Sequence, residues 1–209
     1  MEGASNRNDG VRVEVVTAAF VASGVPEGVR DFGRFVENLN NPAIARHIEL
    51  REAAVRPLYR ASSPLVLDTP VFVRRDEIVF ATFEGPHIAH DVVRTTTAES
   101  PCLLMAPPFQ IQGTIAFAPG AAAAQALRSM LGQFFTVREA RVYDAEGYML
   151  GEGEQIVVNG AAVQMTSPTG RHIEAFVEKA GVARRAARAA EDEAEEEAAF
   201  APERVERAA

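Results

Sequence analysis

Residues 134–143 read FFTVREARVY, and residues 47–55 read HIELREAAV. Each segment contains the triplet Arg-Glu-Ala, with Val two positions after the Ala and apolar residues before the Arg. Apolar residues that recur at about every second position predict a half-buried strand in both segments. Because the same triplet recurs in two predicted strands, we infer that the chain contains one folding unit twice.

Further matches lie on both sides of these two strands. Residues 71–76 line up with residues 155–160, and the changing offset indicates insertions and deletions in loops. We therefore predict a disordered N-terminus over 1–10, a first unit over 11–83, a connecting loop and short strand over 84–105, a second unit over 106–170, and a charged tail over 171–209. Upstream, Val13, Val15, Ala19, Val21 and Gly24 line up with Phe109, Ile111, Ile115, Phe117 and Gly120.

Each unit is predicted to run strand, helix, strand, hairpin. The fold class is therefore α+β and rich in β-structure, with tandem duplicated units and a helical or disordered tail. Residues 71–73 and 78–82 are expected to form the first hairpin, turning at 74–77. The second is expected to join 155–158 to 162–166 through Asn159-Gly160, since both central residues of a type I′ turn need positive φ.

Composition bounds the function of the chain. Its 209 residues are 47% hydrophobic, enough for a sizeable core, and two such small units are expected to pack against each other. A net charge of −8 argues against nucleic acid as a partner, because phosphate contacts need clustered Lys and Arg. We find no run of roughly 20 apolar residues and predict no membrane span. Cys102 is the one cysteine, which favours a buried thiol and a cytoplasmic location.

The chain offers little recognisable catalytic chemistry. His87, His90 and Asp91 are a weak candidate metal site, because two imidazoles and a carboxylate are a familiar ligand set. We find no nucleophile elbow, phosphate-binding loop or dinucleotide fingerprint. The sequence therefore predicts no cofactor and no enzymatic activity.

The second unit is distantly similar to Sm-like proteins and other small β-barrels. The similarity rests on Gly113-Thr114-Ile115, on Val137-Arg138-Glu139-Ala140 and on residues 156–160, IVVNG. It implies a small β-barrel. In Sm-like proteins an Asp/Asn pair in the first motif and an Arg-Gly in the second line the RNA pocket. This chain has Asn159 in place of that arginine, and the first unit follows Arg75 with Asp76.

The repeated triplet also suggests interaction sites. Strand alternation would place Arg51 and Ala53 on one face and Glu52 on the other. We expect a non-enzymatic protein-interaction or assembly module that contacts a protein partner, or a second copy of itself, through strand edges, the middle loop or the tail. A small-ligand or nucleic-acid binding protein is the first alternative, and an enzyme is the second. Candidate interaction residues are Arg51, Glu52, Arg138, Glu139, Arg75 and Asn159.

Overall fold

The computed structural model describes residues 10–41, 43, 46–59, 63–85 and 97–168. Its strands form one open, 11-stranded sheet, joined by two α-helices and two short 3-10 helices. The prediction of a β-rich α+β fold is confirmed. The predicted tail over 171–209 lies outside the described residues, as do residues 1–9 and most of the connecting loop. Neither described helix is long and apolar enough to cross a membrane.

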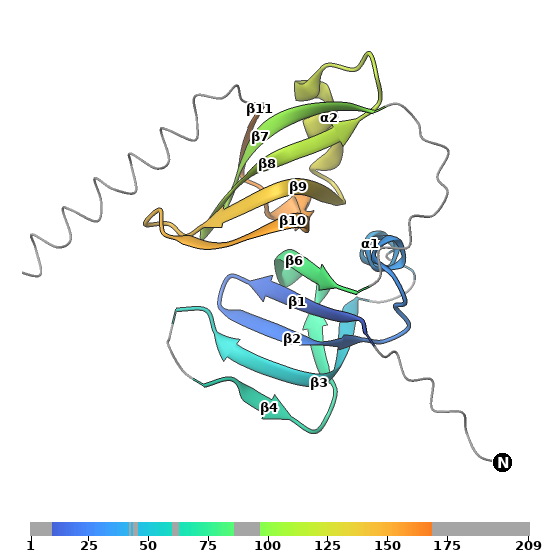
Figure 1. Ribbon diagram of the computed structural model, residues 1–209, viewed down its shortest axis with the longest axis vertical. Helices are drawn as coiled ribbons and strands as arrows, with labels where there is room; N and C mark the ends of the chain where they lie inside the picture. Colours follow the sequence, from blue (N-terminus) through green and yellow to red (C-terminus); the bar gives the residue numbers. More distant parts are fainter. Residues whose placement is uncertain (1–9, 42, 44–45, 60–62, 86–96, 169–209) are drawn as a thin grey trace, which may run out of the picture.

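Residues 12–84 build the first half of the sheet (Figure 1). Its strands follow the spatial order β6-β1-β2-β3, and β3 then pairs with β5 through its first residues and with β4 through its later ones. The elements are β1 (Arg12–Thr17), β2 (Phe20–Pro26), α1 (Phe32–Asn40), β3 (His47–Pro57), β4 (Leu65–Leu67), β5 (Val71–Arg74), the 3-10 helix η1 (Arg75–Glu77) and β6 (Ile78–Glu84).

Residues 98–168 build the second half, with the spatial order β11-β7-β8-β9-β10. Part of the predicted connecting loop, from Ala98 onward, belongs to the long strand β7. The elements are β7 (Ala98–Ala106), β8 (Phe109–Phe117), α2 (Ala123–Met130), β9 (Phe134–Tyr143), β10 (Met149–Asn159), the 3-10 helix η2 (Gly160–Ala162) and β11 (Met165–Pro168).

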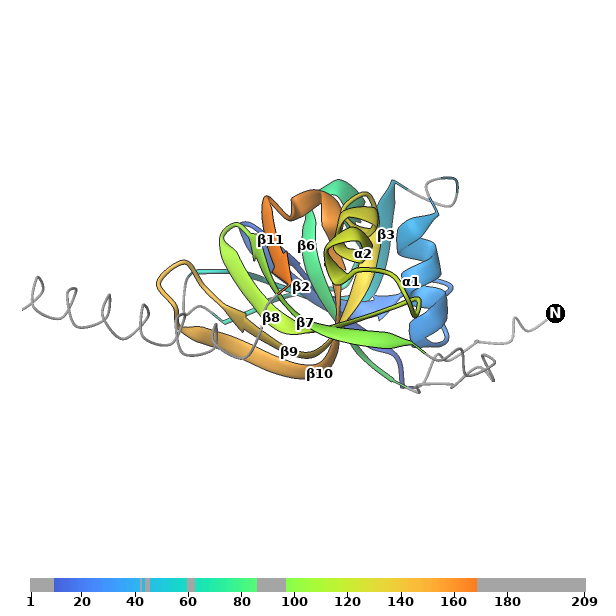
Figure 2. The same ribbon diagram turned by 90° about the horizontal axis from the view of Figure 1, so that it is seen from above.

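The two halves join where β10 pairs antiparallel with β6, and we call this pairing the seam. Ile156, Val157 and Val158 of β10 lie opposite Thr82, Ala81 and Phe80 of β6. Figure 1 shows the two strands next to each other between the halves, and Figure 2 shows the same sheet from above. The seam makes one continuous sheet from segments that are far apart in the sequence.

The side chains of the seam are shared between two apolar cores. Val157 and Phe134 come from the second half but pack in the core of the first. In return, Val79 and Phe80 come from β6 and pack in the core of the second half, where the Phe80 ring meets Phe109 edge to face at 5.1 Å. Because each half completes the core of the other, the halves are expected to fold together.

Two asparagine side chains add hydrogen bonds between the halves. Asn159 is buried and donates from Nδ2 to the Ile78 carbonyl at 2.8 Å, while its Oδ1 accepts from the Ala161 amide at 3.0 Å. Asn40, at the end of α1, donates to the Phe134 carbonyl and accepts from the Phe134 amide, both at 2.8 Å. These bonds satisfy backbone groups next to the seam, where an unpaired group would cost stability.

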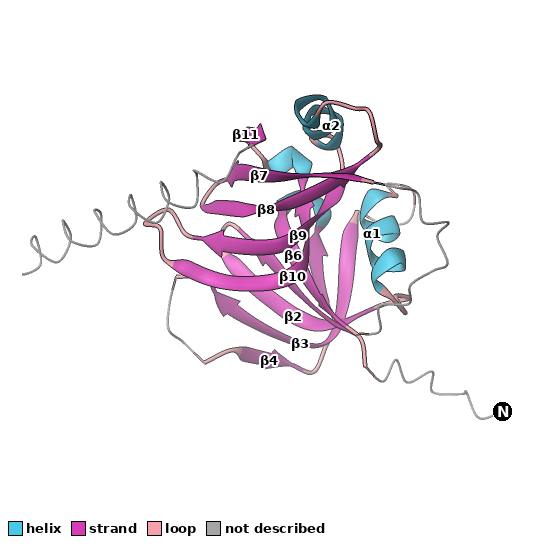
Figure 3. Cartoon of the chain, turned by 45° about the horizontal axis from the view of Figure 1, so that its top comes forward, coloured by secondary structure: helices cyan, strands magenta, loops and turns pink. Residues whose placement is uncertain are grey.

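The helices lie against the sheet and close the cores (Figure 3). Helix α1 begins after Asp31, whose carboxylate accepts from the Arg34 amide at 2.8 Å, and it buries Phe35 and Leu39. Helix α2 buries Ala126 and Leu127. Cys102 lies in the second core, where burial raises the pKa of its thiol to about 12. This result confirms the predicted core thiol.

Both predicted hairpins are wrong. Strand β5 pairs with β3, whereas β6 pairs with β1 and β10, so residues 71–74 and 78–84 are not partners. In the second half, β10 pairs with β9 and β6, whereas β11 pairs with β7. A short 3-10 helix separates the strands in each case and carries the chain across the fold to a distant strand.

The Asn159-Gly160 dipeptide serves a purpose other than a type I′ turn. Asn159 has φ −77°, outside the positive-φ region that this turn needs. A Cβ at Gly160 would lie 2.3 Å from the Met130 carbonyl oxygen and 2.7 Å from that of Gln133. Glycine is therefore required here by the close approach of the α2–β9 connection.

We predict that Gly160→Ala lowers the free energy of unfolding by at least about 2 kcal/mol, because the added methyl overlaps backbone atoms that cannot rotate away. Gly132→Ala is the matched control in the same connection, since a Cβ there meets nothing within 4 Å. Urea unfolding of both variants measures the difference. Equal stability of the two variants would contradict the packing argument.

Candidate functional site

The two Arg-Glu-Ala triplets lie at matching backbone irregularities. Glu52 in β3 has φ 49° and Glu139 in β9 has φ 48°, the two positive values found outside glycine in the described residues. A Cβ at Gly24 would lie 2.7 Å from the Arg51 carbonyl oxygen, and one at Gly113 would lie 2.6 Å from that of Arg138. Each triplet is thus a bulge that crosses a glycine of the neighbouring strand.

The predicted alternation of side chains within the triplet is wrong, because each triplet forms a bulge. Arg51 and Glu52 are both exposed, and Ala53 is buried. The same pattern holds for the second triplet, with Ala140 buried. An extra residue in one strand turns two consecutive side chains toward solvent, which a strict period of two cannot predict.

The arginines of both triplets form ion pairs within the chain. Arg51 Nη2 lies 2.6 Å from Glu27 Oε2, and Arg138 Nη1 lies 2.8 Å from Glu99 Oε1. All four side chains are about half exposed, so these pairs contribute little stability. The arginines lie on the surface and already have acidic neighbours, which any partner would have to displace or share.

The other predicted residues have different surroundings. Asn159 is 4% exposed and bonded inside the seam, so it does not present its side chain to a partner. Arg75 Nη1 donates to the Leu39 carbonyl at 3.3 Å and fastens η1 to the end of α1. His87, His90 and Asp91 lie outside the described residues. Within the described ranges, no group of three or more His, Cys, Asp or Glu side chains could hold a metal ion.

A groove lies between α1 and the β3–β5 pair, with a volume of about 410 Å³. Val29, Phe35 and Ile48 contribute to its apolar lining. A second hollow of about 380 Å³ shares Arg46, His47 and Arg75 with this groove. The charged side chains of the groove lining are Arg46 and Arg75 together with Glu27 and Glu49, and both carboxylates lie near Arg51.

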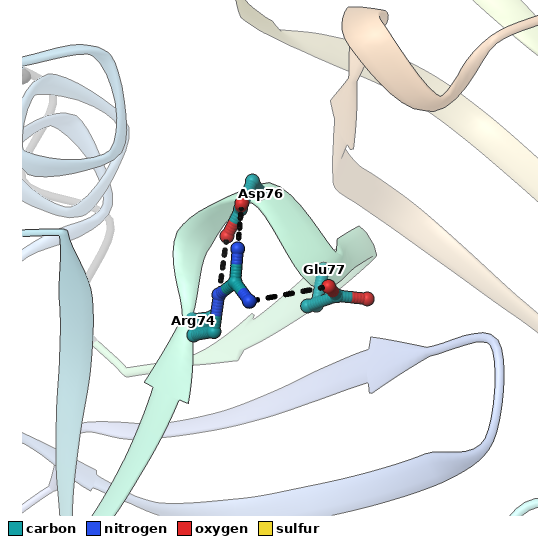
Figure 4. A network of polar contacts seen from close by, with 3 residues as sticks. All are labelled: Arg74, Asp76 and Glu77. Carbon is teal, nitrogen blue, oxygen red and sulfur yellow. Dashed lines mark hydrogen bonds and ion pairs between the residues drawn. The ribbon is translucent and has the colours of Figure 1, made fainter.

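Arg74 also lines the second hollow, but it is engaged with carboxylates (Figure 4). Its Nε donates to Asp76 Oδ1 at 3.1 Å, a second guanidinium nitrogen contacts Asp76 Oδ2, and Glu77 Oε1 lies 3.9 Å from Nη1. The hydrogen bond from Arg74 lowers the pKa of Asp76. The positive charge at this end of the groove is therefore carried by Arg46 and Arg75 more than by Arg74.

Several exposed apolar side chains lie on the edge strands of the sheet, and others lie on β2, just after β3 and around the start of β10: Phe20, Tyr59, Tyr148, Met149 and Leu150. In the described residues, β4 and β5 pair with β3 alone, and β11 pairs with β7 alone. Leu65 and Val66 are exposed on β4, Phe72 is 63% exposed on β5, and Met165 is 59% exposed on β11. Such side chains beside unpaired backbone groups mark surfaces that can accept another strand.

A smaller crevice of about 260 Å³ opens where the first residues of β10 diverge from the first half. Its lining includes Glu14, Arg56 and Glu152 beside apolar side chains such as Phe80 and Phe109. Arg56 Nη2 of β3 lies 3.8 Å from Glu14 Oε2 of β1, across the intervening strand β2. The crevice brings together both halves, but its charged groups largely compensate one another.

In comparisons with known proteins, no family model, no curated protein and no solved structure matches the chain. The candidate sites therefore rest on the contacts and exposures of the described residues.

We predict that Glu52→Gly and Glu139→Gly each raise the free energy of unfolding by about 0.5–1 kcal/mol. Positive φ costs an L-residue about 1–2 kcal/mol, which glycine removes at a smaller entropic cost. Glu152→Gly, in the paired part of β10, is the control and should lower stability by about 0.5–1 kcal/mol. Thermal and urea unfolding check the sign, and a loss in all three variants would contradict strain at the bulges.

Proposed function

We propose that the chain is a non-enzymatic protein-assembly module, made of two copies of one folding unit, that binds protein through the free edges of its sheet. The observation that carries the proposal is the exposure of apolar side chains on β5 and β11, at strand edges that lack a partner among the described strands. Extended segments bind such edges by adding a strand, with main-chain hydrogen bonds supplying affinity.

The duplication is supported by strand register. Val13 of β1 pairs with Gly24, and Cys102 of β7 pairs with Gly113. Each of these glycines lies over the carbonyl of the arginine in its own triplet. In this comparison β8 is the counterpart of β2, and Gly113, rather than Gly120, is the counterpart of Gly24. Alternating apolar residues alone aligned the wrong strand, because adjacent strands share the same period.

The edge positions also differ from the exposed Phe20. Phe20 is 52% exposed but belongs to β2, which is paired on both sides. Phe72 and Met165 instead lie on strands that, in the part of the chain that the structure describes, have a partner strand on one side only. A partner strand there would satisfy backbone groups and cover apolar surface in a single contact.

We expect the immobilised full chain to retain a protein, another copy included, from an extract of its native host after nuclease treatment. A variant with both Phe72→Lys and Met165→Lys should retain it at least about 30-fold less, since a buried aromatic or apolar anchor contributes about 2 kcal/mol or more. The control Phe20→Lys should bind as the parent does. Quantitative mass spectrometry measures retention, and equal binding by the edge variant, or retention of nucleic acid alone, would refute the proposal.

The groove supports a second candidate function, binding of a small amphipathic anion. Apolar side chains form part of its lining, and Arg46 and Arg75 offer guanidinium groups, while the carboxylates of Glu27 and Glu49 in the lining are paired with Arg51. A carboxylate with a short hydrocarbon chain would complement both features, because charge-assisted hydrogen bonds to arginine are stronger than neutral ones.

We expect octanoate to shift the amide NMR signals of α1 and β3 in the full chain, and the uncharged octanamide to do so at least about 10-fold more weakly, as loss of a hydrogen bond to a charged group predicts. Arg46→Gln should weaken octanoate binding by a similar factor. Equal binding of octanoate and octanamide would refute an anion site.

A further inference from the structure

We propose that the partner is a second copy of this chain, bound head to tail, with β11 of one copy pairing antiparallel with β5 of the next. The inference rests on the proposed assembly function and names its partner. We infer that the contact between two chains has the same strand pairing as the seam within one chain, where β10 pairs antiparallel with β6.

Strand register identifies which residues would take the place of the seam residues. In the first half, Ala81 of β6 pairs with Val15 of β1. In the second half, Thr166 of β11 pairs with Leu104 of β7. Val15 in turn pairs with Ala22, as Leu104 pairs with Ile111. Thr166 therefore occupies the position of Ala81, so β11 is the counterpart of β6.

The same reasoning relates β5 to β10. Leu50 pairs with Val71, and Val137 pairs with Ile156, each at the residue before the arginine of its triplet. Val71, Phe72 and Val73 therefore occupy the positions of Ile156, Val157 and Val158, which corrects by one residue the sequence alignment of 71–76 with 155–160. Among the described residues, β5 is thus a counterpart of β10 that pairs on one side only, with β3, and β11 is a counterpart of β6 that pairs on one side only, with β7.

The side chains that the seam buries are the ones exposed at these free edges. Val157 is fully buried in the core of the neighbouring half, and its counterpart Phe72 is 63% exposed. Phe80 is 6% exposed, and its counterpart Met165 is 59% exposed. A head-to-tail contact would bury both, and Phe72 is the larger apolar side chain that such a contact would use as an anchor.

Two differences set the expected strength of the contact. Arg74 occupies the position of Asn159, so the hydrogen bond from Asn159 to the Ile78 carbonyl has no identical counterpart. His47 occupies the position of Phe134, so the packing of the Phe134 ring in the core of the other half has no identical counterpart either. The seam also forms within one chain, at a high effective concentration. We therefore expect association that depends on protein concentration in the micromolar to millimolar range.

A head-to-tail contact is heterologous, because it joins two different surfaces. Each added copy presents a new free β5 or β11, so the assembly either closes into a ring or continues as an open chain. A symmetric contact, with β5 against β5 or β11 against β11, would instead stop at the dimer.

Complementation between two blocked variants tests the polarity of the contact. Phe72→Lys leaves β11 intact, and Met165→Lys leaves β5 intact. We expect the purified parent to associate beyond the dimer in sedimentation velocity experiments up to about 1 mM. Each variant alone should be monomeric over that range, whereas an equimolar mixture should form a one-to-one dimer and nothing larger.

The register is tested by cross-linking in a Cys102→Ser background. Val71 and Ser167 occupy the positions of Ile156 and Thr82, which lie directly opposite in the seam. Chains with Val71→Cys should form a disulfide with chains carrying Ser167→Cys. Chains with Thr166→Cys should not, since a one-residue shift turns the side chain to the other face.

A parent protein that stays monomeric up to about 1 mM, a dimer formed by either lysine variant alone, or a mixture that fails to associate would each overturn head-to-tail assembly. Circular dichroism of both variants, with Phe20→Lys as the folded control, excludes loss of fold as the cause. If the pure chain is monomeric but the host extract yields a different protein that the double edge variant loses, the assembly function stands and only the identity of the partner is wrong.

Discussion

The structure depends on the pairing of β10 with β6. This short antiparallel contact joins β6, from the middle of the described chain, to β10, from its last third, and exchanges side chains between two cores. Neither half is large, and a small domain on its own buries too little apolar surface for high stability. Each half buries more apolar surface because side chains of the other half pack in its core: Val157, Phe134, Val79 and Phe80. Asn159 and Asn40 satisfy backbone groups beside the contact.

The seam also explains why the surface of the molecule is asymmetric. A symmetric contact between two like units would cover the same edge of each. The seam instead covers β6 of the first half and β10 of the second half, which are not counterparts of each other. Complementary edges at opposite ends of the sheet therefore have no partner among the described strands, and they carry Phe72 and Met165. The proposed duplication and the proposed head-to-tail assembly are two consequences of this polarity.

Parts of this arrangement could be predicted from the sequence, and the reasons for success and failure are local. The strands around Leu50 and Val137 were predictable because apolar residues alternate there, and the helix over Phe32–Asn40 because Phe35 and Leu39 recur at helical spacing. The hairpin at Asn159-Gly160 was wrong because the same dipeptide also suits a close backbone approach, and nothing local separates the two uses. The exposed edge residue Phe72 resembles any core phenylalanine in sequence, since its exposure depends on which strands lie beside β5.

The sequence by itself determined the β-rich composition of the fold, the positions of most strands, and the repeated Arg-Glu-Ala triplet that now marks two equivalent bulges. These features follow from residue type and short-range periodicity. Only the tertiary structure decided which strands pair, that β6 and β10 are shared between cores, and that β5 and β11 are left at the edges. Strand pairing joins residues far apart in the chain through backbone groups that every residue carries. A local sequence pattern therefore does not indicate which strand lies beside it.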